Sequence, residues 1–170
     1  MDLKKTLAKE HSKFQTLQIV DYVGVNKERF KQIINIYLAG PYRITQRAAW
    51  PLSYCVERHP ELIEPHLKTI LDFVDRPDTQ VAVRRNTVRL LQFIEIPKRF
   101  HARVINLCFE YLLNKKQPVA VKVFSMTVLA NLSQSSPEIK KELRIAIEDQ
   151  LPYGSAGFVS RAKKVLKEIG

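Results

Sequence analysis

Seven polar side chains, six of them cationic, recur off the apolar faces of predicted helices and could bind an anionic partner. They are Lys68, Arg99, Arg103, Asn106, Lys140, Lys141 and Arg144. A spacing of 38 residues aligns Lys68 with Asn106 and Arg144, and the same spacing aligns Arg103 with Lys141. Lysine and arginine neutralise phosphates and carboxylates, so such a row would suit nucleic acid or an acidic protein surface. The alternative is an ordinary solvated face, because exposed helix positions are commonly charged.

Three arginines stand on the same period of 38 residues. Arg47 and Arg85 are one period apart, and Arg161 lies two periods after Arg85, with Val123 at the intervening position. A side chain that recurs at one structural position suggests a role in building repeats, such as a bond to a preceding carbonyl group or carboxylate. We therefore predict that these arginines are structural.

The sequence contains no convergent acid, base and nucleophile. His59 and His66 are seven residues apart, without a His-Glu-x-x-His pattern or a third ligand. Cys55 and Cys108 both lie in apolar helical patterns and neither belongs to a Cys-x-x-Cys pair, which favours reduced intracellular core thiols. We expect no catalytic residue, no metal site and no cofactor.

The formal net charge of +11 favours an anionic partner. The excess peaks in residues 79–116, which carry 8 basic and 2 acidic residues. No segment approaches the run of about 20 apolar residues that spans a bilayer, so we expect a cytoplasmic protein without membrane insertion.

The sequence predicts helices throughout the chain, because no segment shows the alternation of apolar and polar residues that is typical of a half-buried strand. Glycines at 24 and 40 and prolines at 60, 97 and 137 mark helix ends and starts. The pattern predicts nine helices over 3–22, 26–39, 42–58, 61–75, 79–94, 98–114, 117–133, 137–151 and 155–169. Short connections leave no room for an interdomain linker, so one domain over 1–170 is predicted.

Three segments resemble the first helix of a HEAT-like repeat: 46–52 (QRAAWPL), 78–91 (DTQVAVRRNTVRLL) and 157–166 (GFVSRAKKVL). The resemblance covers about 42–170 and implies an all-α fold, a right-handed α-α superhelix of the armadillo type. It divides the domain into a helical pair over 1–40 that could be a cap, repeats over 41–77, 78–116 and 117–154, and a terminal helix over 155–170. It also implies that second helices line a concave surface, which would then carry the seven polar side chains.

The fold resemblance implies a non-catalytic scaffold, and we expect its partner to be an acidic protein surface. A nucleic-acid binder with a basic concave face is the alternative. Such a chain would distantly resemble the bacterial alkylpurine DNA glycosylases of HEAT-like fold, which combine tryptophans with a catalytic aspartate. Here Trp50 is the single tryptophan and Tyr54, not an acid, follows one turn later. Because Trp50 aligns with Val88 and Met126, we expect it to pack between repeats.

Overall fold

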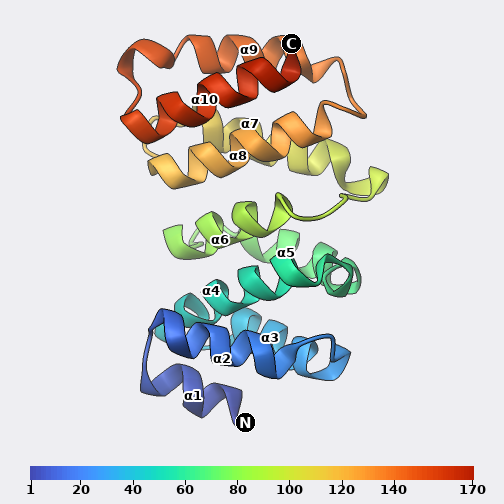
Figure 1. The fold of residues 1–170 in the computed structure, drawn as a ribbon, viewed down its shortest axis with the longest axis vertical. Helices are drawn as coiled ribbons and strands as arrows, with labels where there is room; N and C mark the ends of the chain where they lie inside the picture. Colours follow the sequence, from blue (N-terminus) through green and yellow to red (C-terminus); the bar gives the residue numbers. More distant parts are fainter. The chain divides into compact units, whose positions relative to one another are not determined.

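The computed structural model describes all 170 residues, and every regular element in it is helical (Figure 1). The chain divides into two compact units, residues 1–94 and 95–170. The first unit contains α1 (Leu3–Lys9), α2 (Lys13–Val23), α3 (Lys27–Ala39), α4 (Tyr42–Arg58), α5 (Leu67–Val74) and α6 (Val81–Leu91). The second contains α7 (His101–Leu113), α8 (Val119–Leu132), α9 (Ile139–Glu148) and α10 (Ala156–Ile169). The division falls inside the predicted repeat over 78–116, and the single domain over 1–170 stays a prediction.

In both units, helices of successive pairs pack against each other. In the first unit α3 packs more extensively on α4, the first helix of the next pair, than on α2, and in the second unit α7 packs extensively on α8. First helices also lie side by side: α4 contacts both α2 and α6, and α8 contacts α10. A helical pair therefore buries its apolar face only when the next pair is present, which is the physical basis of a stacked helical repeat.

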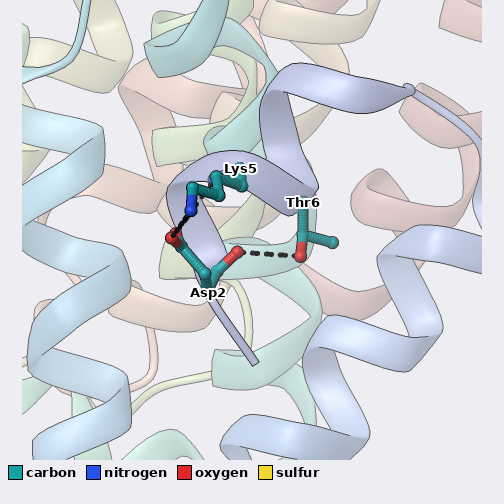
Figure 2. Close-up of polar contacts among 3 residues, drawn as sticks. All are labelled: Asp2, Lys5 and Thr6. Atoms are coloured by element: carbon teal, nitrogen blue, oxygen red, sulfur yellow. Dashed lines mark hydrogen bonds and ion pairs between the residues drawn. The ribbon is translucent and has the colours of Figure 1, made fainter.

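The predicted single helix over 3–22 is wrong, because the chain folds there as two helices. Helix α1 is capped by Asp2, whose carboxylate accepts a hydrogen bond from the Lys5 backbone N–H at 3.1 Å (Figure 2). Helix α2 starts afresh at Ser12, whose hydroxyl accepts from the Gln15 N–H at 3.1 Å. Both caps satisfy a backbone donor that a helix start leaves free. The structure thus has ten α-helices where nine were predicted.

The predicted helix over 61–75 is also wrong in its first half. Two 3₁₀ turns, Pro60–Leu62 and Glu64–His66, come first, and α5 begins only at Leu67. Proline lacks the backbone donor that a continuous α-helix needs, so Pro65 prevents an unbroken helix from residue 61. The predicted helix ends at Gly24 and Gly40 are confirmed, and Gly24 has the positive φ of 47° that disfavours other residues.

Each unit has its own apolar core. In the first, Tyr37 is 1 % exposed, its ring meets Phe73 edge-on at 5.3 Å, and its hydroxyl lies 2.9 Å from the Thr87 hydroxyl. In the second, Val128 and Leu129 of α8 are fully buried among side chains of the neighbouring helices. These cores hold the surfaces described below in place.

Both cysteines are expected to be unreactive in the folded protein. Burial raises the pKa of the Cys55 and Cys108 thiols to about 12, so the nucleophilic thiolate is nearly absent at pH 8. A chromogenic disulfide reagent should detect almost no reactive thiol in the native protein and two thiols per chain in guanidinium chloride. Rapid labelling of either thiol under native conditions would contradict the buried placement.

Candidate partner-binding surface

Six of the seven predicted binding residues lie in the second unit. Arg99 belongs to the 3₁₀ turn Lys98–Phe100 that leads into α7, and Arg103 and Asn106 belong to α7 itself. Lys140, Lys141 and Arg144 belong to α9, and α7 and α9 are in contact. We call the five cations Arg99, Arg103, Lys140, Lys141 and Arg144 the basic face of the second unit. Lys68 belongs to α5 of the first unit.

The local partners of these cations differ. The Lys68 ammonium forms an ion pair with Asp72 at 2.7 Å, so part of its charge is already neutralised. Arg144 lies 3.5 Å from Glu148 and donates a hydrogen bond to the Gly170 carbonyl. The guanidinium of Arg99 stacks 4.9 Å from the centre of the Phe100 ring and is exposed, as is Lys141.

The arginines on the 38-residue period contact different groups. The Arg47 guanidinium donates to the carbonyls of Leu7 and Ala8 at 2.9 and 2.8 Å, in the last turn of α1. Such carbonyls have no partner inside their own helix, and a cation there also complements the helix dipole. Arg161 donates to the Thr127 hydroxyl at 2.5 Å, whereas Arg85 is exposed. A common structural role for all three stays a prediction.

Trp50 and Tyr54, one turn apart on α4, form an aromatic cluster in the first unit. The His11 ring meets Trp50 edge-on at 5.2 Å, and the Tyr54 ring is 6.4 Å from Trp50. The Arg89 guanidinium lies 4.5 Å over the Tyr54 ring and lowers the pKa of its hydroxyl. Burial, and then the positive charges of Arg47 and Arg85, lower the pKa of His11. The cluster therefore presents half-buried π faces beside cations.

A pocket of about 680 Å³ opens in the second unit, among the C-terminal ends of α7 and α9 and the N-terminal ends of α8 and α10. The Gln150 side chain connects the elements that form the wall of the pocket. Its amide N–H groups donate to the Leu112 and Ala146 carbonyls, both at 3.0 Å, and its amide oxygen accepts from the Lys122 ammonium at 2.8 Å. One side chain thus joins α7, α8 and α9 at the pocket.

Comparison with known proteins adds the family. A sequence model of the family described as HEAT repeat domain matches residues 3–169. The chain belongs to the HEAT repeat domain family. No curated protein and no solved structure matches it. The resemblance noted for 42–170 is therefore confirmed and extends over the N-terminal helices, and the all-helical structure agrees with an α-solenoid.

HEAT repeat domains are helical scaffolds that typically serve interactions and are generally non-catalytic. No group of three or more His, Cys, Asp or Glu side chains that could hold a metal ion occurs in this structure. None of its helices has the length and apolar character needed to cross a membrane.

The pocket is the feature of this HEAT repeat protein that sequence reasoning missed. Its residues come from the ends of four helices and the connections between them, whereas the predicted binding residues were chosen from predicted second helices alone. One signal was present: Gln150 lies 38 residues after Leu112, one repeat period from the carbonyl it bonds. A polar side chain one period from a helix C-terminus could have been recognised as a bond between neighbouring repeats.

Proposed function

We propose that the chain is a non-catalytic binding module that holds an acidic protein surface against the basic face of the second unit. The observation that supports it most directly is the presence of five cations on two contacting elements, α7 with its leading turn and α9. Residues 95–170 contain 13 basic and 7 acidic residues, so the whole unit attracts acidic partners as well. Complementary charge speeds encounter and selects the partner.

Charge reversal tests this proposal. The double variant Arg103→Glu/Lys141→Glu should reduce recovery of a saturable protein partner from nuclease-treated native lysate at least tenfold, about 1.4 kcal/mol of binding free energy. Lys163→Glu/Lys167→Glu on α10 is the matched control, because it makes the same change in net charge on another helix. Circular dichroism should show unchanged helix content in both. Equal recovery by the two double variants would contradict a role for the basic face.

The aromatic cluster at Trp50 and Tyr54 favours a second candidate function, nucleic-acid binding. Bases stack on exposed aromatic rings, and the neighbouring Arg89 could contact a phosphate. If this candidate is correct, nuclease should abolish recovery of any partner, and affinity for a labelled single strand should fall steeply with salt. Salt-insensitive or absent binding of the single strand would exclude it.

A further inference from the structure

The pocket in the second unit combines two lysines with a polar bridge, and its ammonium groups are short of negative charge. Lys122 is half-buried, and burial lowers its pKa, with a further lowering from the like charge of Lys115. Asp149 also lines the pocket but forms no ion pair with either lysine. Two neighbouring cations without a carboxylate partner favour the binding of an anionic group.

Gln117 requires a hydrogen-bond donor from a ligand, whereas the two lysines favour an anionic acceptor. This side chain is 8 % exposed, it lines the pocket, and its buried amide oxygen has no hydrogen-bond donor. Buried acceptors without a donor are uncommon and cost folding free energy. The terminal amide turns about a soft torsion, so an N–H group of a bound molecule can satisfy it. A ligand for this pocket should therefore carry an anion and an N–H donor together.

The rim of the pocket is apolar and unusually exposed. Leu113, Val119 and Tyr153 are 55 %, 44 % and 90 % exposed, and all three line the opening. Large apolar side chains that gather in the open around a pocket are typical of protein-binding sites, and tyrosine is enriched in the residues that dominate binding energy. The open rim suits a segment of polypeptide better than an enclosed small molecule.

We propose that this pocket binds an acidic residue of an extended segment in a partner protein, with its carboxylate at Lys115 and Lys122 and its apolar neighbours against Leu113, Val119 and Tyr153. The backbone of such a segment supplies the N–H group that Gln117 lacks. The proposal rests on the proposed function as a protein-binding module, but it concerns a different surface from the basic face.

Nuclear magnetic resonance with the ¹⁵N-labelled full chain tests the proposal. The probe is the peptide acetyl-Ala-Leu-Asp-Leu-Ala-amide, and the matched probe has Asn in place of Asp. We expect saturable shifts at the signals of Gln117, Lys122 and Gln150, with at least tenfold weaker binding of the Asn peptide, because a charge-assisted bond is lost. Equal binding of the two peptides, or shifts scattered over the chain, would overturn the proposal.

Single substitutions test what each pocket residue contributes to peptide binding. Lys115→Gln and Lys122→Gln should each weaken the Asp peptide several-fold, and Lys115→Gln leaves the Gln150 hydrogen bonds untouched. Lys163→Gln on α10 is the control and should bind as the unaltered chain does. Gln117→Leu should raise the melting temperature while weakening the probe, since it removes an unpaired buried acceptor that the ligand needs. A lower melting temperature with unchanged binding would contradict that role.

Two further outcomes are decisive. If acetate alone produced the same shifts with the same affinity per carboxylate, a small anion would be the occupant and the peptide proposal would be wrong. If the probe peptide did not bind while Arg103→Glu/Lys141→Glu still abolished partner recovery, the pocket proposal would fail and the binding function of the basic face would stand.

Discussion

Replacing Tyr37 by alanine is expected to lower the free energy of unfolding of the first unit by about 3 to 5 kcal/mol. The ring is almost completely buried and packs edge-on against Phe73, so its removal leaves a cavity that α3 and α4 cannot close. Its hydroxyl also forms a hydrogen bond with the Thr87 hydroxyl of α6 at 2.9 Å, and the substitution leaves Thr87 without that partner. Urea unfolding followed by circular dichroism measures the change.

Milder substitutions separate the hydroxyl from the ring. Tyr37→Phe keeps the packing and should cost about 1 to 3 kcal/mol, because the Thr87 hydroxyl loses a buried partner. Thr87→Val should cost a similar amount, and a double-mutant cycle should give a coupling energy of about 1 kcal/mol. Additive single effects would show that the two hydroxyl groups do not interact. An alanine variant as stable as the phenylalanine variant would contradict the buried position of the ring.

Periodicity predicted the architecture because it is a property of the chain alone. The recurrence of Arg47, Arg85 and Arg161 reflects repeats of constant length, and a repeat can be recognised before any contact is known. The exact helices depended on local chemistry that competes with the apolar pattern. Ser12 starts a new helix inside the predicted helix over 3–22, and Pro65 replaces the expected α-helix by 3₁₀ turns. Both signals were in the sequence, and the apolar periodicity outweighed them.

The sequence predicted which helices carry the basic face, but it did not predict all the contacts of their side chains. Spacing placed Arg103 and Lys141 at equivalent positions, and the structure puts them on two helices in contact. The 38-residue spacing takes no account of carboxylates one turn away, although the four-residue separation of Lys68 and Asp72 is itself typical of an ion pair on a helix. Bonds between distant segments, such as that of Arg144 to the Gly170 carbonyl, required coordinates.

The exposed apolar side chains of the pocket could not be predicted, for a different reason. Exposure of Leu113, Val119 and Tyr153 depends on how helix ends and their connections pack, and the apolar pattern alone would place such residues in the core. The unpaired Gln117 oxygen likewise follows from burial of a loop residue. Helix middles obey periodicity, whereas helix ends obey local capping and loop geometry. Sequence reasoning based on periodicity is therefore weakest where repeat proteins form such pockets.

Gln150→Leu is expected to lower the free energy of unfolding of the second unit by about 2 to 3 kcal/mol. Leucine is similar in size but cannot bond, so it leaves the Leu112 carbonyl without its side-chain donor and the half-buried Lys122 ammonium without its acceptor. The stranded cation should account for most of the loss, since a group that is charged and partly desolvated depends strongly on its hydrogen bonds.

Thermal and urea unfolding measure the loss, and Gln134→Leu is the matched control, because Gln134 is exposed and should change stability by less than about 0.5 kcal/mol. Combining Gln150→Leu with Lys122→Met should recover part of the stability, because the unpaired cation is then removed as well. Recovery would identify the cation as the source of the loss. If the double variant were instead as unstable as the two single changes added together, Gln150 would act mainly through its hydrogen bond to the Leu112 carbonyl of α7.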